Sequence, residues 1–397
     1  MAEGLSGGFK GSDSAPKMRQ RKGDPAALAR AAVIAGFAIL TSGGAAPSSA
    51  QAGHVSIGYT YTHTRVNCPD AQPRGPEDGT DAGWRGRRKV PSVNSADSIV
   101  FHYDQPSVRA QVDATLKAMR ASADALRLLV WIGGSDLSAT SGPRVHLGLF
   151  SNEANVPPVL LNNISGITKK AASLGYSKVY IVFGNQGSTS PKCPKSGQTG
   201  CFNGSHLAGD WNLRKQVIDA ARLGSSAGTS VYFDLAGESC PGGGGSPEVQ
   251  ADMQQFVTYM VKEYAKVYGD DHSFVSCHGH ALKRAKNGLD SIVTLYRSAG
   301  IRPHTLDLHI YVSDEQVVKD VLTYGESVAQ STGWRLSVLE TAYDDQAVFS
   351  TIAALRLHND LPLFETLIIW PKTLDSSCGF TIQWPTDLSK VNRVVNG

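Results

Sequence analysis

Two glutamates stand directly after apolar runs whose composition is typical of buried strands. Glu238 follows residues 229–237, in which β-branched and aromatic residues alternate with small or polar ones, and Glu340 follows the run Leu336–Leu339. Alternation of this kind predicts a strand. Parallel α/β barrels place their reactive groups at the C-terminal ends of their strands. The two glutamates are therefore the candidate catalytic pair.

Two carboxyl groups are what retaining hydrolysis of a glycosidic bond requires. One carboxylic acid protonates the leaving oxygen, and a carboxylate about 5–5.5 Å away attacks the anomeric carbon. Strands four and seven of a barrel face each other across its mouth. The long stretch of chain between Glu238 and Glu340 is therefore compatible with this geometry.

Other predicted strand ends carry side chains suited to a sugar. Tyr311 shares a strand face with His309 and lies nearer the expected rim, where its hydroxyl would hydrogen-bond the nucleophile. The indole of Trp370 offers an apolar platform for a sugar ring, although a place in the core is the alternative for both Trp370 and His309. The candidate substrate-binding residues are His102, Trp131, Asn185, His309, Tyr311 and Trp370.

Strand-like and helix-like segments alternate from residue 96 onward. The predicted strands are Ser98–Tyr103, Leu126–Ile132, Lys178–Phe183, Val231–Leu235, Ser273–Cys277, Thr305–Tyr311, Leu336–Leu339 and Thr366–Trp370. The predicted helices, each with an apolar stripe, are Ser107–Ala121, Pro158–Leu174, Trp211–Ser225, Pro247–Tyr268, Gly288–Ala299, Asp314–Ser331 and Asp344–His358. Such alternation predicts parallel strands joined by right-handed crossovers.

The number of repeats favours an α/β fold of the (β/α)₈ barrel type, which takes about 250 residues before insertions. An open doubly wound sheet is the alternative, and it is disfavoured because no glycine-rich phosphate loop follows the first strand. One more strand, His54–Tyr61, precedes the repeats and either caps the barrel or pairs beside its first strand. We expect the barrel over 96–397 and a strand-and-loop extension over 53–95.

The first 52 residues match a secretory leader. Four basic residues between positions 19 and 30 precede the apolar run Ala31–Leu40, and small residues follow up to Ala52. The apolar run is shorter than the roughly 20 residues that span a bilayer. The leader carries three more basic than acidic side chains, so its removal takes the formal net charge from +3 to zero. A neutral chain favours neither nucleic acid nor an anionic membrane as a partner, and we expect a secreted or periplasmic monomer.

All six cysteines follow the leader, and an even number in an exported chain favours disulfides. Of the fifteen possible connectivities, sequence spacing favours Cys193–Cys201, and Cys240 and Cys277 follow adjacent predicted strands that a bridge could join. Cys68 and Cys378 would then form the remaining pair. No CxxC pair occurs, and Cys277 with His278 and His280 lacks the spacing of a tetrahedral zinc site. We therefore expect neither a metal nor a cofactor. The absence of a Gly-x-Ser-x-Gly elbow also disfavours a serine hydrolase.

These motifs resemble the clan A glycoside hydrolases, retaining enzymes built on a (β/α)₈ barrel. The resemblance covers residues 96–375 and depends on Glu238, Glu340, the His-x-Tyr of 309–311 and Trp370. In that clan the strand-four glutamate is the acid/base and the strand-seven glutamate is the nucleophile, which implies these roles for Glu238 and Glu340.

The chain departs from the clan at Gly237, where the clan usually has an asparagine that binds the sugar 2-hydroxyl. Three interpretations are open: another residue such as Asn185 takes this role, the substrate is unusual, or the activity is weak or lost. The resemblance implies an exported retaining glycosidase, and long loops expected after the third and fourth strands favour a polysaccharide substrate. The alternative is a catalytically inactive barrel that binds carbohydrate or serves as a cell-surface scaffold.

Overall fold

Strands and helices alternate along the chain in the computed structural model. It describes residues 53–61, 72–73, 99–132, 148–149, 155–184, 207–242, 247–370, 372–376, 379–383 and 388–397. These residues belong to a unit that spans 50–397. Within this described part, no helix is both long and apolar enough to cross a membrane.

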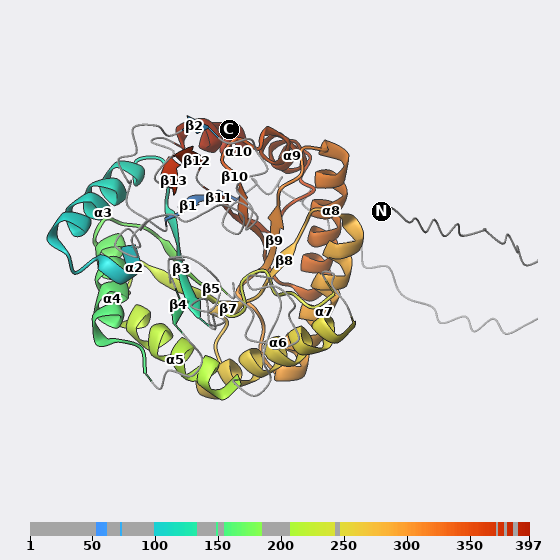
Figure 1. The fold of residues 1–397 in the computed structure, drawn as a ribbon. Helices are drawn as coiled ribbons and strands as arrows, with labels where there is room; N and C mark the ends of the chain where they lie inside the picture. Colours follow the sequence, from blue (N-terminus) through green and yellow to red (C-terminus); the bar gives the residue numbers. More distant parts are fainter. Residues whose placement is uncertain are drawn as a thin grey trace, which may run out of the picture. The chain divides into compact units, whose positions relative to one another are not determined.

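Nine parallel strands form a nearly closed barrel, ringed by helices (Figure 1). Their order in the sheet is β7-β6-β5-β3-β1-β11-β10-β9-β8. The strands are β1 (Ser56–Thr60), β3 (Ala125–Ile132), β5 (Lys178–Gly184), β6 (Ser230–Asp234), β7 (Ser273–Phe274), β8 (Ser276–His278), β9 (Leu306–Ile310), β10 (Leu336–Ala342) and β11 (Phe364–Trp370). The (β/α)₈ barrel that the sequence predicts is therefore confirmed.

The barrel closes through one extended segment that pairs on both sides. β7 pairs with β6 and β8 pairs with β9, and only Val275 separates β7 from β8. Leu235 N donates to Phe274 O on the first side, and Gly279 N donates to His309 O on the second. β7 and β8 therefore share the fifth place of an eight-place barrel, which brings the fourth, sixth and seventh places close together.

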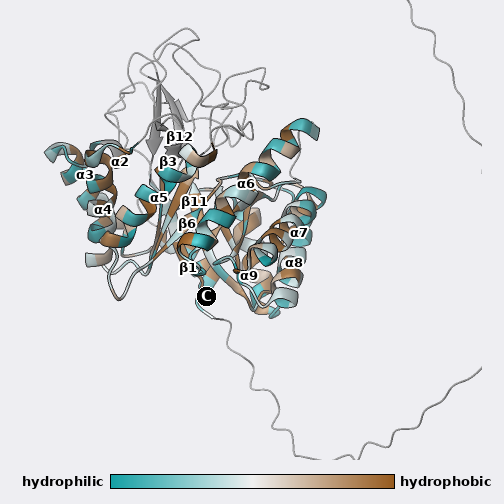
Figure 2. Ribbon diagram, turned by 90° about the horizontal axis from the view of Figure 1, so that it is seen from below, coloured by the Kyte–Doolittle hydropathy of each residue, from teal (hydrophilic) through white to brown (hydrophobic). Residues whose placement is uncertain are grey.

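The helices pack their apolar stripes against the strands. They are α2 (Ile99–His102), α3 (Pro106–Met119), α4 (Pro158–Ser173), α5 (Leu207–Gly224), α6 (Pro247–Val267), α7 (Leu282–Ala299), α8 (Glu315–Thr332), α9 (Gln346–Leu357) and α10 (Ser389–Asn396). In Figure 2 the strands around β11 are mainly brown, whereas teal residues mark the outer sides of the helices. All seven helices predicted from the apolar stripes are present, α7 beginning six residues earlier than expected.

The predicted first strand is wrong. Residues 99–102 form α2, and the first barrel place belongs to β1, which pairs with β3 on one side and β11 on the other. Both segments are short apolar runs, and periodicity alone does not distinguish them. Because β1 already fills the gap between β3 and β11, no strand edge remains there for residues 98–103. A separate small sheet pairs β12 (Lys372–Ser376) with β13 (Gly379–Gln383) and β2 (Gln72–Pro73).

Candidate active site

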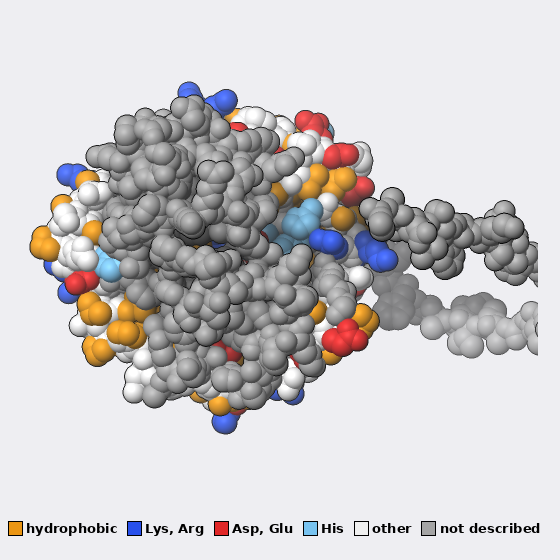
Figure 3. Space-filling view, in the orientation of Figure 1, with side chains coloured by type: hydrophobic (Ala, Val, Ile, Leu, Met, Phe, Trp, Pro, Cys, Tyr) orange, Lys and Arg blue, Asp and Glu red, His pale blue; other side chains and the backbone are white. Residues whose placement is uncertain are grey.

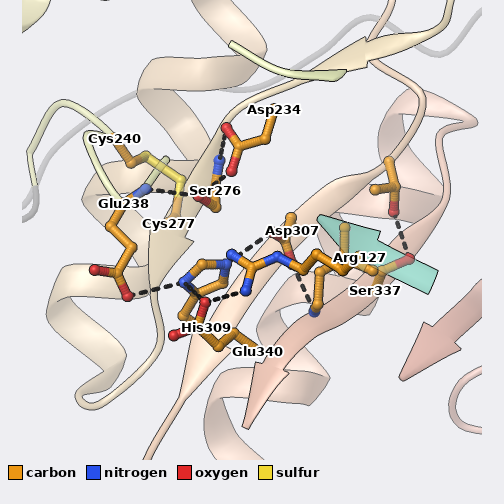
Figure 4. A network of polar contacts seen from close by, with 12 residues as sticks. Arg127, Asp234, Glu238, Cys240, Ser276, Cys277, Asp307, His309, Ser337 and Glu340 are labelled. Carbon is orange, nitrogen blue, oxygen red and sulfur yellow. Dashed lines mark hydrogen bonds and ion pairs between the residues drawn. A yellow bond between two sulfur atoms is a disulfide. The ribbon is translucent and has the colours of Figure 1, made fainter. Parts of the chain in front are cut away.

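The two glutamates meet inside the mouth of the barrel (Figure 4). Glu238 lies in the turn after β6, the fourth strand place, and Glu340 lies in β10, the seventh. One oxygen of each carboxylate and one nitrogen of His309 all lie within 4.8 Å of one another. The side chain of Glu238 is 24% exposed and that of Glu340 is 9% exposed. The nearest oxygens of the two carboxylates are thus within 4.8 Å of each other, which is compatible with the spacing of about 5–5.5 Å between the carboxyl groups of a retaining glycosidase.

Glu340 is positioned by a bulge in β10. Between Ser337 and Glu340 the strand advances three residues, while its neighbour β9 advances two, from Asp307 to His309. The backbone N–H of Leu339 donates to the buried carboxylate of Asp307 at 2.8 Å instead of to a strand carbonyl. Bulges next to active sites redirect a side chain, and this one presents Glu340 to the barrel interior beside His309.

Both oxygens of Glu340 accept strong hydrogen bonds. Arg127 Nη1 donates to Oε2, and the Tyr311 hydroxyl donates to Oε1. Arg127 also donates to Thr60 Oγ1 at 3.2 Å. Burial would lower the pKa of Arg127, but the charges of Glu340, Asp307, Asp234 and Tyr311 together outweigh burial, and the pKa is raised. The guanidinium therefore remains charged and holds the carboxylate in one orientation.

Arg127 was missed in the sequence analysis. It lies in β3, in the second strand place, and its side chain is 1% exposed. The sequence does contain an indication of its importance, because Arg127 interrupts the apolar run Ala125–Ile132. An isolated charge inside a buried strand requires a partner. The sequence does not identify that partner, since Glu340 is 213 residues away.

His309 stands among three carboxylates. Its Nδ1 lies 3.0 Å from Glu238 Oε1 and 3.6 Å from Glu340 Oε2, and its Nε2 lies 3.2 Å from Asp307 Oδ2. The side chain is fully buried, which by itself lowers its pKa. The carboxylates of Glu340, Asp307 and Glu238 outweigh burial and raise the pKa well above its ordinary value. His309 is therefore an imidazolium at neutral pH.

Glu238 is the other half of this ion pair. Burial raises its pKa, but the hydrogen bond from His309 and the charges of His278, His309 and Arg127 lower the net pKa to about 2. At neutral pH the shared proton accordingly resides on His309, and Glu238 is a carboxylate. A general acid needs that proton. The hydrogen bond between His309 Nδ1 and Glu238 Oε1 provides a direct path for it.

His278 and His280 extend the site along the fifth strand place. His278 ends β8 and is paired in register with His309, and its ring centroid lies 4.7 Å from that of His280. Burial lowers the pKa of both, to about 4 for His280. Figure 3 shows histidine side chains next to Lys and Arg side chains on this face, near α7 and α8. From the sequence, metal ligation was the only role weighed for His278 and His280.

The remaining predicted substrate-binding residues have different outcomes. Trp370 ends β11 and packs beside Tyr311, Leu129 and Val182; its Nε1 has no hydrogen-bond partner among the described residues. His102 ends α2 instead of a strand, and its Nδ1 lies 3.0 Å from Gln105 Nε2, so its predicted place at a strand end is wrong. Asn185 and the side chain of Trp131 are outside the described residues.

Gly237 lies where the chain leaves β6 and passes against β5. A Cβ atom at this position would be 3.0 Å from Val182 Cγ1 and 3.1 Å from the backbone oxygen of Phe183. The backbone oxygen belongs to a paired strand and moves only with that strand. The turn is therefore fitted to glycine, and an asparagine would not enter it without displacing β5.

Cys240 and Cys277 form a disulfide next to the site, as predicted. Both sulfurs are buried, and the bridge joins the turn that follows Glu238 to β8. Cys68, Cys193, Cys201 and Cys378 are outside the described residues, and their pairing stays a prediction.

Two groups of side chains within the described residues have ligand atoms close enough for a metal ion. They are Asp234, Asp307 and His309, and Glu238, His309 and Glu340. The donor chemistry does not fit a cation, because His309 carries a proton and Arg127 already occupies Glu340 Oε2. A metal ligand histidine must be neutral.

No protein-family model matches the chain, and no curated protein matches it. Several solved structures are similar in fold. A modular endo-beta-1,4-mannanase of glycoside hydrolase family 26 from Cellulomonas fimi is 12% identical with a TM-score of 0.49, covering 87% of this chain and 70% of that one. A GH26 endo-beta-1,4-mannanase from Bacillus sp. JAMB-750 is 12% identical with a TM-score of 0.44, covering 81% and 78%.

A fungal beta-1,4-galactanase is 14% identical with a TM-score of 0.39, covering 64% of this chain and 80% of that one. At these identities the likeness concerns the fold alone, because one fold serves many unrelated activities. The similar structures named here are two mannanases and a galactanase, and the likeness of this chain to them is one of fold.

Proposed function

We propose that this protein is an exported retaining glycoside hydrolase that acts on a polysaccharide. The observation that carries the proposal is the approach of Glu238 and Glu340 to within 4.8 Å, from the fourth and seventh strand places, with His309 between them. An inverting enzyme needs about 6.5–9.5 Å between its carboxyl groups to admit a water molecule.

In the proposed reaction Glu340 is the nucleophile. Its carboxylate, oriented by Arg127 and Tyr311, attacks the anomeric carbon while the bond to the leaving oxygen breaks. The proton on His309 Nδ1 passes to Glu238 across the 3.0 Å hydrogen bond and from Glu238 to that oxygen, which leaves Glu238 a carboxylate and His309 a neutral imidazole. In the second step Glu238 deprotonates a water molecule that releases the sugar from Glu340. Asp307, in contact with Nε2, stabilises the imidazolium that supplies the first proton.

The test compares the wild type with Glu340→Gln and Glu238→Gln. We would measure reducing-sugar release from a panel of β-glycans that includes mannan and galactan, the polymers named for similar structures. Each variant is expected to lose at least about 10³-fold in rate, because a nucleophile or acid/base is removed. Proton NMR of the first product identifies its anomer. Release of the inverted anomer would contradict the mechanism.

Binding measurements on the same panel separate the enzyme from an inactive carbohydrate-binding barrel. A wild type that binds one glycan and cleaves none would support the inactive alternative. Export is supported by the Cys240–Cys277 disulfide, because disulfides persist in oxidising compartments. Expression with the leader and N-terminal sequencing of the exported chain would test cleavage near Ala52, and light scattering would test the expected monomer.

A further inference from the structure

The backbone at Glu238 adopts a conformation that its residue type disfavours. Its φ of 57° is in the left-handed region, which among the described non-glycine residues only Asn359 shares. Residues with a side chain hold this conformation when their surroundings impose it, and such positions are frequent at active sites. The contacts that impose it on Glu238 therefore determine where its carboxylate lies.

A buried serine makes the decisive contact. Glu238 N donates to Ser276 Oγ at 2.7 Å, and the Ser276 hydroxyl donates to Asp234 Oδ2 at 2.6 Å. Asp234 Oδ1 accepts from Ser276 N and Ala236 N, each at 3.3 Å. Asp234 and Ser276 are fully buried. Because the Ser276 hydroxyl directs its hydrogen to Asp234, its oxygen is free to accept the hydrogen bond from Glu238 N.

The neighbouring disulfide prevents Ser276 from moving relative to the turn. Cys277 follows Ser276 directly, and Cys240 is two residues after Glu238 (Figure 4). Helix α7 packs on the bridge so closely that a Cβ on Gly288 would lie 2.8 Å from Cys240 Sγ. Just before the turn, Arg214 Nε donates to Leu235 O at 2.9 Å.

We propose that Ser276, oriented by Asp234, is a positioning residue that holds Glu238 in its left-handed conformation and aims its carboxylate at His309 and the leaving oxygen. The proposal rests on the proposed function, since it takes Glu238 as the acid/base. Neither residue is distinguished for this role by the sequence alone.

The kinetic test uses leaving groups that differ in their need for a proton. Ser276→Ala removes the acceptor. Ser273→Ala is the matched control, because Ser273 is equally buried in the same strand place and its hydroxyl lies 3.3 Å from Tyr296 OH. The substrates are phenyl and 2,4-dinitrophenyl β-glycosides of mannose, galactose and glucose. A phenolate leaves slowly without protonation, whereas dinitrophenolate leaves unaided.

We expect Ser276→Ala to lower kcat/KM on the phenyl glycoside by about 10–100-fold and on the dinitrophenyl glycoside by less than about threefold. Ser273→Ala should change both substrates equally, and Ser276→Thr, which keeps the hydroxyl, should restore most of the loss. Equal losses on the two substrates in Ser276→Ala would overturn the positioning role.

A second readout does not depend on catalysis. Imidazole ¹H–¹⁵N NMR follows the protonation of His309, whose raised pKa depends in part on Glu238. In Ser276→Ala the displaced carboxylate should let His309 lose its proton at a lower pH. If the wild type cleaves no glycoside but this shift appears, the proposed function fails and the positioning role stands. An unchanged His309 titration overturns the positioning role. If Ser276→Ala does not fold, the same His309 titration is carried out on Asp234→Asn. This variant has nearly the same shape, but its amide nitrogen cannot accept the hydrogen bond from the Ser276 hydroxyl.

Discussion

His309 Nδ1 donates a hydrogen bond of 3.0 Å to Glu238 Oε1, and this contact joins the sixth strand place to the turn after the fourth. Against the effect of burial, the contact and the nearby charges lower the pKa of Glu238 to about 2, and Glu340, Asp307 and the contact itself raise that of His309, so the two groups hold one proton between them. Strongly interacting groups titrate as a pair. The pair loses its proton only as the pH rises through the raised value of His309.

Replacing His309 should therefore move the alkaline limb of the pH–rate profile. In His309→Asn the catalytic proton resides on Glu238 itself and is lost at the pKa of that carboxyl group. Burial then raises the pKa of Glu238 above about 2, but it stays below that of the wild-type pair. We expect the alkaline limb of kcat/KM to lie at lower pH than in the wild type. An unchanged alkaline limb would show that His309 does not carry the proton.

Arg127→Met should destabilise the fold as well as reduce activity. Arg127 and Glu340 form a buried pair with side-chain exposures of 1% and 9%, and removing one member leaves an uncompensated charge. We expect a loss of about 3–5 kcal/mol in the free energy of unfolding, measured by denaturant titration. The double variant Arg127→Met/Glu340→Gln should lose less free energy of unfolding than the sum of the losses in the two single variants. Additive costs would contradict a direct pair.

Gly237→Asn should not improve the enzyme, although it restores the usual clan residue. The new side chain would begin 3.1 Å from the backbone oxygen of Phe183. Overpacking of this kind costs about 1–3 kcal/mol, which thermal unfolding would detect. Gly237→Ala isolates the Cβ contribution from that of the amide. Higher activity with unchanged stability in Gly237→Asn would contradict the close approach to β5.

Protonation of His304 should lower the stability of the fold at acidic pH. It stacks on Tyr232 with ring centroids 3.4 Å apart, and burial lowers its pKa well below the ordinary value. A depressed histidine pKa means that the unfolded chain binds the proton more readily below about pH 6.5, so stability falls as the pH decreases. The variant His304→Phe keeps an aromatic ring against Tyr232 but does not titrate. Its Tm should therefore fall less between pH 7 and pH 5 than that of the wild type, by about 2–4 °C for each kcal/mol of stability that protonation of His304 removes. An equal fall in Tm in the wild type and in His304→Phe would show that His304 is not responsible for the loss of stability in acid.

Local sequence determined much of the fold. The helices from α3 to α9, the strand β3 and the strands from β5 to β11 follow from apolar periodicity, because each element buries its own stripe or face. The same reasoning placed Glu238 and Glu340 near strand ends and Tyr311 beside His309. These are short-range patterns, which neighbouring residues encode by themselves.

The remaining features of the fold and of the site depend on closure of the barrel. Long-range pairing gave the first strand place to β1 instead of residues 98–103, since both runs satisfy the local pattern. The partner of Arg127, the proton on His309 and the close fit of Gly237 all depend on which strands meet across the barrel. Electrostatic and packing energies depend on distances in space, and residues far apart in the chain acquire those distances only when the sheet closes.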